Sequence, residues 1–482
     1  MALVALSAVA FGYGPTAHET VGGVADKLLE NTAAQTQIAS LLDGISLEKA
    51  AVMPDEIKAW DRDGADDLGA FPHYSQHPEI DKQLRAFWLA NQPTHDRASE
   101  APSHHWFHYT DVPVVNPQKY SDGKAGRSRW DIVQIIGYCV DVLRGDAPEE
   151  NPRKITKPVA VILLAHFLAD IHEPMHVGAQ FFDEAGRPVD PDKTQPGFGD
   201  EGGNTIALRL SSGTPEVLAK RSLKLHGFWD NDAVVANLSL PVGLAKEQRS
   251  QAIEKAKRAL IDQFARNEPA NWRVPANVPL NKYAEAWADD ILPRAREAHE
   301  RLEFTGVHPL EQEDRTVAAG VAVEKSMPDQ VGYTDWAANI VREELHKAGW
   351  RLADLLRQVV ASSGTTTKSA TIATSLAAPS PSPSPSQTPV APAPAATTTI
   401  ASTPFGEYPA NYKEIVSAWL KANSLDGSNV QWQGEPKPAE TPAGDGRKLS
   451  GYLVIFNTQE RSGLKTRSVL IRDGAVISNS GF

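Results

Sequence analysis

The chain has 482 residues with a formal net charge of −12 at pH 7, and 41% of its residues are hydrophobic, so we expect a largely globular protein of about two or three domains. The acidic balance excludes a broadly basic surface that binds duplex DNA non-specifically, although bound dications could still attract a nucleic-acid substrate locally. The single cysteine, Cys139, excludes an intrachain disulfide framework and a thiolate-rich zinc site.

Residues 1–12 are apolar and small, which is typical of the end of a secretory signal, with Ala10 and Gly12 at the small positions before a cleavage site. No positive segment precedes them, so we expect the natural start to lie upstream. We therefore predict an exported protein, secreted or periplasmic, whose mature chain begins at Tyr13. The alternative is an apolar tail without a targeting role. No stretch is long and apolar enough to span a bilayer, so we expect no membrane insertion.

Residues 13–361 are predicted to form one mainly α-helical domain. Apolar residues recur about every three to four positions in six segments, which indicates helices. These segments are residues 19–30, 128–144, 155–173, 246–267, 281–303 and 334–361. Strand signals are sparse, and the best is at 205–210. The segments 61–105 and 177–203 are long and polar, and we expect functional loops there.

Residues 362–404 are mostly Ser, Thr, Ala and Pro, which predicts a disordered, extended linker. Residues 405–482 are predicted to form a small α+β domain, and they contain no His or Cys. The expected elements of this domain are a helix over 412–420, strands at 452–456, 468–471 and 475–477, and a hairpin turn at Asp473-Gly474. No feature of this domain predicts its function.

The most informative segment carries His166, Asp170, His172 and His176 within eleven residues. Residues 166 and 170 are four apart, so on a helix they project from one face. An imidazole and a carboxylate at this spacing can chelate zinc. Pro174 is expected to end the helix, so that His176 turns toward a different metal ion. The alternative is a polar helix face followed by a histidine-rich loop.

Further residues that can bind metal recur along the first domain. His226 and Asp230 repeat the four-residue spacing of His166 and Asp170. Several such segments together indicate a multi-metal site, whereas one pair alone would be weak support. The remaining motif residues, in chain order, are Tyr13, His18, Asp55, Lys58, His108, Tyr109, Asp111 and Asn204.

With these motifs the chain resembles the zinc-dependent, single-strand-specific type I nucleases of fungi, plants and bacteria, which share a helical fold with the trinuclear-zinc phospholipases C. The resemblance covers residues 13 to about 357 and excludes the linker and the C-terminal unit. It implies an endonuclease with three Zn²⁺ that cuts single-stranded RNA and DNA to 5′-phosphorylated products. A 3′-nucleotidase activity is a further expectation.

The resemblance also implies how the ligands divide among the zinc ions. The first zinc of a close pair would be held by Asp55, His108, His166 and Asp170. The second would be held by the main-chain amine and carbonyl of Tyr13, by His18 and by a bridging Asp170. The third, more open zinc would be held by His176, His226 and Asp230. The family normally begins with Trp, but main-chain atoms make these bonds, so we expect Tyr13 to be tolerated.

The expected catalytic residues are Asp55, Lys58 and Asp170. Metal ions lower the pKa of bound water, which supplies a nucleophile for phosphorus at neutral pH. Asp55 would orient that nucleophile, and Lys58, one helical turn later, would stabilise charge on the phosphate.

The expected substrate-binding residues are Tyr109, Asp111 and Asn204. The resemblance implies this role for Tyr109 and Asp111, which match the family positions that hold a base beside the scissile phosphate. An aromatic face stacks on any base, and a carboxylate accepts a hydrogen bond from a base amino group. Asn204 follows two glycines, which permit close backbone approach. The alternative for the first two is a core tyrosine and a turn aspartate.

The other histidines of this region are not expected to bind metal. His172 is interpreted as a supporting or core histidine. Those of the first long segment are expected to be mostly solvated surface residues, and no spacing argument makes His104 or His105 a ligand. They are His73, His77, His95, His104 and His105.

Two other functions stay open at this point. The same fold would suit a phospholipase C, and a third hypothesis is a binding protein that acts through its C-terminal domain, with a degenerate first domain. All eight side-chain ligand positions carry competent ligands, which argues against degeneration.

Overall fold

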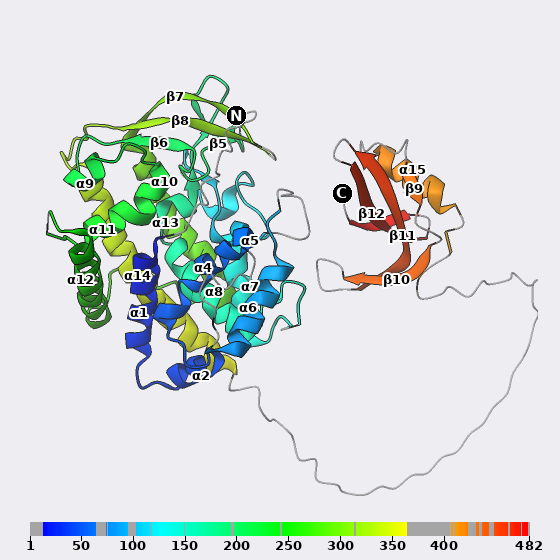
Figure 1. Cartoon of the computed structure of the whole chain (residues 1–482), viewed down its shortest axis with the longest axis horizontal. Helices are drawn as coiled ribbons and strands as arrows, with labels where there is room; N and C mark the ends of the chain where they lie inside the picture. Colours follow the sequence, from blue (N-terminus) through cyan, green and yellow to red (C-terminus); the bar gives the residue numbers. More distant parts are fainter. Residues whose placement is uncertain are drawn as a thin grey trace, which may run out of the picture. The chain divides into compact units, whose positions relative to one another are not determined.

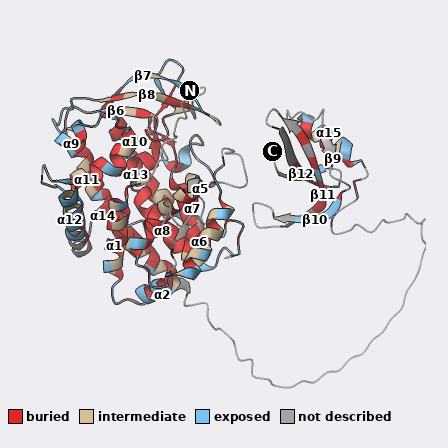
Figure 2. Ribbon diagram, in the orientation of Figure 1, coloured by how far each residue is buried: buried red, intermediate tan, exposed pale blue. Residues whose placement is uncertain are grey.

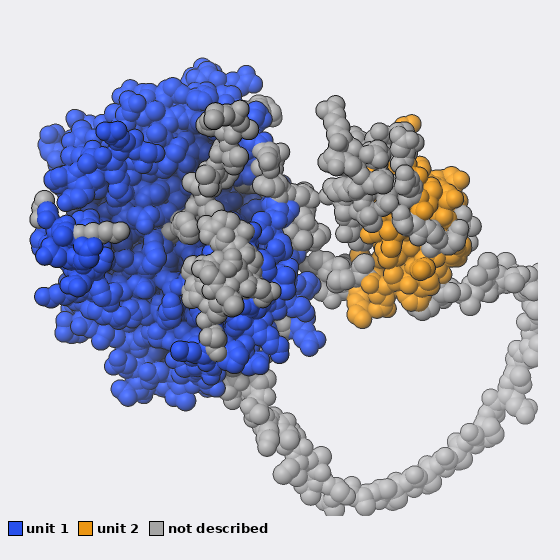
Figure 3. Space-filling model, in the orientation of Figure 1, with its two compact units in different colours: residues 1–372 blue, residues 373–482 orange. Residues whose placement is uncertain are grey.

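A computed structural model describes residues 13–63, 74, 76–94, 103–116, 118–148, 150–193, 197–241, 243–312, 315–363, 405, 408–409, 411–422, 430–432, 436–442, 448–460, 463–473 and 475–480. The chain divides into two compact units, residues 1–372 and residues 373–482 (Figure 3). The predicted signal segment and residues 364–404 of the predicted linker lie outside the described residues.

The first unit is built mainly from helices, which confirms the predicted fold class (Figure 1). The six helices predicted from apolar spacing are present, with ends shifted by a few residues. They are α1 (Pro15–Leu29), α7 (Ile132–Arg144), α8 (Lys157–Asp170), α12 (Lys246–Arg266), α13 (Tyr283–Glu300) and α14 (Tyr333–Ser363).

Helix α8 is the buried centre of this unit. Every residue from Val159 to Asp170 is buried, and Figure 2 shows the helix in red among its neighbours. It packs against α7, α1 and α14. Because neighbours surround it, the helix is apolar on all sides. The helix begins after Thr156, whose hydroxyl accepts the backbone N–H of Val159. Its last turn therefore carries His166 and Asp170 into the interior.

The end of α8 differs from the prediction. The helix ends at Asp170, four residues before Pro174, and Pro174 begins a separate 3₁₀ helix, η4 (Pro174–His176). The Glu173 carboxylate accepts the backbone N–H of His176 at 2.6 Å and so caps that turn. This cap is the local reason why His176 leaves the direction of α8.

Short helical segments connect the long helices, and most were too short for a periodic pattern to reveal. The first-unit segments are α2 (Ala33–Leu41), α3 (Leu47–Ala50), α4 (Met53–Glu56), η1 (Ile57–Ala59), α5 (Trp60–Asp63), η2 (His104–His108), η3 (Tyr120–Asp122), α9 (Pro215–Leu218), α10 (Leu225–Gly227), the π-helix η5 (Phe228–Ala233), α11 (Val234–Asn237) and η6 (Leu280–Lys282).

The two segments predicted to be long loops contain regular structure, so that prediction was wrong for their described parts. The first holds helix α6 (Pro78–Ala90), which buries Ile80, Leu84 and Phe87 on one face. The second holds β2 (Gly178–Ala179), β3 (Phe181–Phe182), β4 (Pro188–Val189) and β5 (Phe198–Gly199), of which the last three form a sheet in the order β4-β3-β5.

The first unit also contains more β-structure than predicted. Strand β6 (Ile206–Arg209) lies where a strand was expected, but the hairpin of β7 (Leu302–Glu311) and β8 (Thr316–Glu324) was missed. The sheet order is β6-β8-β7, with β6 parallel to β8. Most side chains of β7 are partly or fully exposed, so the strand carries little apolar pattern.

A short parallel pair links two segments that carry predicted ligands. Strand β1 (Val112–Pro113) pairs with β2, and Val112 lies opposite Gly178. The pairing continues toward the histidines, because the N–H of Thr110 donates to the carbonyl of His176 at 2.8 Å. The segments that follow His108 and His176 therefore run side by side.

The second unit is a small α+β domain, as predicted. Helix α15 buries Val416 and Leu420 against Val454, Phe456 and Val469 of the sheet. The sheet order is β10-β11-β12-β13, and β9 pairs with β11. Its elements are α15 (Tyr412–Ala422), β9 (Val430–Trp432), β10 (Lys437–Pro442), β11 (Lys448–Glu460), β12 (Gly463–Arg472) and β13 (Ala475–Ser480). The first two strands were not predicted.

Among the described residues, no helix combines the length and the hydropathy needed to cross a bilayer.

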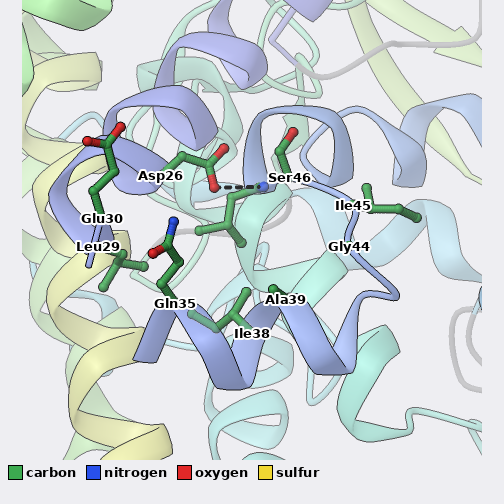
Figure 4. Close-up of a pocket in the computed structure, with 10 residues that line it drawn as sticks. Asp26, Leu29, Glu30, Gln35, Ile38, Ala39, Gly44, Ile45 and Ser46 are labelled. Atoms are coloured by element: carbon green, nitrogen blue, oxygen red, sulfur yellow. Dashed lines mark hydrogen bonds between the residues drawn. The ribbon is translucent and has the colours of Figure 1, made fainter. Parts of the chain in front are cut away.

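A cavity of about 300 Å³ lies between α1 and α2, and none of the predicted metal ligands lines it (Figure 4). Asp26 of α1 lies at its wall. Its carboxylate accepts the backbone N–H groups of Leu47 and Glu48 at 3.0 and 2.9 Å, and the first of these bonds is the dashed line in Figure 4. Burial raises the pKa of Asp26 to about 6, against the opposing effect of these two bonds. Asp26 thus fastens the start of α3 to α1.

We predict that Asp26→Ala lowers the free energy of unfolding by about 1–3 kcal/mol, because two backbone donors lose their acceptor. Urea denaturation at neutral pH measures this difference. Glu30→Ala is the matched control, since Glu30 lines the same cavity but is exposed, and we expect a change within about 0.5 kcal/mol. Equal stability of the two variants would contradict the role given to Asp26.

Candidate metal centre

The side chains predicted to bind metal lie together in the interior of the first unit. They come from seven elements spread over more than 200 residues of the sequence, and all except Asp55 are buried. The set, with its elements, is His18 (α1), Asp55 (α4), His108 (η2), His166 and Asp170 (α8), His176 (η4), His226 (α10) and Asp230 (η5).

Asp170 lies at the centre of this set and has no exposed surface. Its Oδ2 lies 3.0 Å from His108 Nδ1 and 3.0 Å from His166 Nε2. Its Oδ1 lies 3.4 Å from His18 Nε2 and 3.9 Å from His176 Nδ1. The two oxygens therefore face different histidines, which is the geometry that a carboxylate bridging two cations needs.

Asp55 completes this part of the centre. Its carboxylate lies 3.8 Å from His166 Nε2, 3.9 Å from His108 Nδ1 and 3.9 Å from His18 Nε2. The rings of His18 and His166 stack with centroids 3.8 Å apart. Two ligands of one tetrahedral zinc ion stand about 3.4 Å apart, given a metal–ligand distance of about 2.0–2.1 Å. The contacts of Asp170 with His18, His108 and His166 are 3.0–3.4 Å, and those of Asp55 are up to 0.5 Å longer than this value.

A second group of ligands lies beside the first. Asp230 Oδ1 is 3.6 Å from His176 Nε2, and Asp230 Oδ2 is 3.4 Å from His226 Nε2. Asp230 belongs to a π-helical turn, a rare element that often occurs at functional sites. His176 lies between the two groups, because it also approaches Asp170.

Backbone carbonyls fix the orientation of three histidines. The Nδ1–H of His166 donates to the Ala51 carbonyl at 2.6 Å, and that of His176 donates to the His108 carbonyl at 2.7 Å. His226 does the same toward Gly202 at 3.0 Å. Because Nδ1 carries the proton in this arrangement, the lone pair of Nε2 points into the centre, as metal-binding histidines require.

Several buried polar atoms of the centre have no hydrogen-bond partner. A buried nitrogen or oxygen without a partner is costly unless a cation satisfies it. These atoms include both ring nitrogens of His18, Asp170 Oδ1, His176 Nε2, His226 Nε2 and Asp230 Oδ1. The ligand atoms of the centre form three sets, and within each set all atoms lie within 4.8 Å of one another. The sets are His18/His166/Asp170, Asp55/His108/His166 and His176/His226/Asp230. The residues present therefore fit metal ions.

The pKa values of these groups agree with this fit. Burial lowers the pKa of His18 to about 3, so its ring is neutral and able to coordinate. Burial alone would raise the pKa of Asp55, but Lys58, His166 and His108 hold it well below its usual range. Burial would lower the pKa of His176, yet Asp170, Asp230 and Glu173 outweigh it and raise the value to about 10. A bound cation would replace that proton.

The predicted mature N-terminus lies beside the second group. The Tyr13 side chain is fully buried, and the N–H of Gly14 donates to the carbonyl of Asp230 at 2.8 Å. Ligation by the main chain of Tyr13 stays a prediction, because it requires cleavage after Gly12, and residues 1–12 lie outside the described residues.

Lys58 is buried, and its ammonium group lies 2.7 Å from Asp55 Oδ1. This contact stabilises the ionised form of Asp55 and fixes its position. Contact with a substrate phosphate remains a prediction.

The predicted substrate-binding residues flank the centre. Tyr109 is partly exposed and directly follows His108, whereas Asp111 is only 8% exposed. Backbone hydrogen bonds fix the position of both residues: the Tyr109 carbonyl accepts the N–H of Ile132, and the N–H of Asp111 donates to the Gly126 carbonyl. Asn204 is partly exposed in the turn after Gly202, and its amide donates to the carbonyl of Glu201 at 3.1 Å. Their contacts with a base stay predictions.

Two of the remaining histidines differ from expectation. His104 was expected at the surface but is 2% exposed, and His105 is half-buried. Both contact Asp61, a residue that was not singled out from the sequence.

His172 is a core histidine whose Nδ1–H donates to the Leu168 carbonyl and whose Nε2 accepts from Arg351, each at 2.7 Å.

The other histidines of the first long segment are less informative. His77 is partly exposed and pairs with Asp43. His73 and His95 lie outside the described residues.

Comparisons with known proteins identify a nuclease family. The S1/P1 nuclease family matches residues 13–361. Endonuclease 4 of Arabidopsis thaliana is 26% identical over 157 residues, which is 29% of this chain and 44% of that protein. Endonuclease 1 of the same plant is 33% identical over 146 residues, 28% of this chain and 39% of that protein. Endonuclease 2 of this plant is 20% identical over 176 residues, which is 35% of this chain and 48% of that protein. The matched parts thus span less than half the length of these curated relatives.

We predict that Gly202→Ala disturbs the His176/His226/Asp230 group. Gly202 has a φ of +59°, and a Cβ there would lie 2.1 Å from the carbonyl oxygen of Met175. The shift needed to relieve this clash would move the carbonyl that orients His226. We expect a lower metal content, which elemental analysis measures. Urea unfolding should show a loss of stability larger than the cost of about 1–2 kcal/mol for placing a residue other than glycine in a left-handed conformation.

Gly145→Ala is the matched control for this variant. Gly145 also has a positive φ, of +80°, but among the described residues no atom lies within 4 Å of the position that a Cβ would occupy. It should show only the conformational cost and unchanged metal content. Equal metal content in both variants would contradict the orienting role of Gly202.

Proposed function

Because the chain belongs to the S1/P1 nuclease family, we propose that it is a zinc-dependent endonuclease that hydrolyses the phosphodiester bonds of single-stranded RNA and DNA. The proposed products carry 5′-phosphates, and 3′-nucleotidase activity is part of the proposal. The observation that carries it is the buried set of imidazole and carboxylate groups around Asp170, in which Oδ1 faces His18 and Oδ2 faces His108 and His166.

The ligand types support zinc as the metal. All side-chain donors in the centre are imidazole nitrogens or carboxylate oxygens, which zinc accepts in tetrahedral or five-coordinate sites. Within the centre, the ligand atoms fall into three sets, two of which share His166, and this grouping supports three ions. When bound, zinc lowers the pKa of a coordinated water and neutralises negative charge on a phosphate.

The protein residues have distinct proposed roles in this reaction. Asp170 lies between His18, His108 and His166, and together these residues would hold metal ions beside one shared carboxylate. Asp55 is kept ionised beside Lys58, so it can accept a hydrogen bond from the attacking water and orient it. Tyr109 would stack on a base next to the scissile phosphate, which suits a strand whose bases are unpaired.

Export is a further part of the proposal. The apolar residues 1–12 support it, and so does the burial of Tyr13 with Gly14 bonded to Asp230. Removal of residues 1–12 would free an amine next to the centre, which gives the cleavage a chemical role besides targeting.

We predict that Asp170→Asn lowers hydrolysis of single-stranded DNA and RNA by on the order of 100-fold or more, because bound metal contributes several kcal/mol of transition-state stabilisation. Metal analysis should show fewer ions than in the wild type. The assay includes a 3′-mononucleotide and phosphatidylcholine as further substrates. Full activity in the variant, or a wild-type protein that binds no zinc, would reject the proposal.

Asp232→Asn is the matched control for Asp170→Asn. Asp232 is also buried and lies two residues from Asp230, but it pairs with Lys220 at 2.6 Å outside the centre. Its variant should keep metal content and activity. Hydrolysis of phosphatidylcholine in place of nucleic acid would assign the centre to a phospholipase C.

We predict that Tyr109→Ala lowers kcat/KM on single-stranded oligonucleotides by about tenfold or more, because base stacking contributes about 1–3 kcal/mol. Zinc content should stay unchanged, which elemental analysis checks. Loss of zinc with the activity would instead mean that Tyr109 supports the centre structurally.

A further inference from the structure

A further group of metal-binding side chains lies outside the centre described above. Asp61, His104 and His105 offer ligand atoms that all lie within 4.8 Å of one another. Asp61 Oδ2 is 2.6 Å from His105 Nε2 and 3.2 Å from His104 Nε2. None of these residues is among the ligands of the metal centre, and we call this group the Asp61 cluster.

The Asp61 cluster is built on the same two segments as part of the metal centre. One is the helical run from α4 to α5, which carries Asp55 near its start and Asp61 near its end. The other is η2, which begins with His104 and His105 and ends with His108. Asp55 faces His108, and Asp61 faces the two histidines at the opposite end of η2. The fold therefore repeats a carboxylate–imidazole contact along one pair of segments.

Trp88 orients the carboxylate of this cluster. Its indole N–H donates to Asp61 Oδ1 at 2.7 Å. Asp61 Oδ2 faces the Nε2 atoms of both histidines, and Oδ1 also lies 3.2 Å from His104 Nε2. Donors around a metal site commonly hold a ligating carboxylate in this way. Although burial would raise the pKa of Asp61, the contacts with His104, His105 and Trp88 hold it well below its usual range, so the carboxylate is negatively charged.

The hydrogen bonds present do not satisfy His104. The side chain is 2% exposed, and its Nδ1 has no partner among the described residues. Burial lowers the pKa of His104 to about 4, so the ring is neutral at neutral pH. Ligation through Nε2, the nitrogen that faces Asp61, would place the remaining proton on Nδ1. A neutral buried imidazole next to a carboxylate is the form that binds a metal ion.

The cluster is also open to solvent on one side. The side chains of His105 and Asp61 are 32% and 14% exposed, whereas Asp170 of the metal centre has no exposed surface. An ion could enter from solvent, and water could complete its coordination. Three protein ligands with one open position form a common zinc arrangement.

We propose that Asp61, His104 and His105 bind an additional divalent cation, separate from the metal centre. Two imidazole nitrogens and one carboxylate oxygen select a late first-row metal such as Zn²⁺, because Mg²⁺ and Ca²⁺ prefer oxygen ligands alone. The ion exchanges with solvent more readily than the ions of the metal centre, because two of its three ligands are accessible.

The test compares zinc binding by the full chain with that of His105→Gln at micromolar free Zn²⁺, set by equilibrium dialysis. His105 is the most exposed ligand, so this variant should fold. We expect it to bind about one Zn²⁺ per chain fewer than the wild type. His77→Gln is the matched control, because His77 lies 3.0 Å from Asp43 but belongs to no such cluster among the described residues, and it should bind as much zinc as the wild type.

Crystals of the zinc-loaded protein give a second measurement. Anomalous scattering at the zinc edge should show a peak between Asp61, His104 and His105, absent in Asp61→Asn. Equal zinc binding by the wild type and His105→Gln, with no such peak, would overturn the proposal and leave Asp61 as a hydrogen-bond acceptor only.

These results can be separated from those for the metal centre. The ion at the Asp61 cluster is measured as the difference in bound Zn²⁺ between the wild type and His105→Gln, so the result does not depend on how many ions the metal centre holds. A wild type without zinc at Asp170 but with a His105-dependent ion would reject the proposed function and support this site.

Discussion

The first unit depends on one buried carboxylate. Asp170 has no exposed surface and lies at the C-terminal end of α8, where the helix dipole disfavours negative charge. Burial would raise its pKa, but His166, His176 and His18 hold the value well below its usual range. The carboxylate is therefore compatible with the core only as part of a cationic environment.

The arrangement around Asp170 follows from this constraint. The histidines must present a lone pair inward, and the carbonyls of Ala51, His108 and Gly202 achieve this by accepting Nδ1–H bonds from His166, His176 and His226. Those carbonyls belong to short segments and turns, because a carbonyl within a long helix is already bonded. The irregular parts of the first unit thus have a structural purpose.

The sequence predicted the parts of the fold that depend on local periodicity. The long helices carry a regular apolar stripe or, in α8, a continuous apolar surface, and they were found with ends off by a few residues. Helix α6 and the β7–β8 hairpin were missed, because their polar and exposed positions weaken the pattern. The ligand candidates came from motif spacing and family resemblance, and the structure brings all eight side chains together. The Asp61 cluster was out of reach, since 43 and 44 residues separate Asp61 from its two histidines and only tertiary structure joins them.

The complete burial of Asp170, His18 and His166 has a kinetic consequence. Solvent and a substrate phosphate would reach an ion bound between them from the side of the partly exposed Asp55, while the buried ligands stay in place. Release of the ion would require these buried ligands to move apart, so ion exchange would follow local opening of the surrounding helices. A protein built this way would retain its ions through dilution into a metal-poor medium.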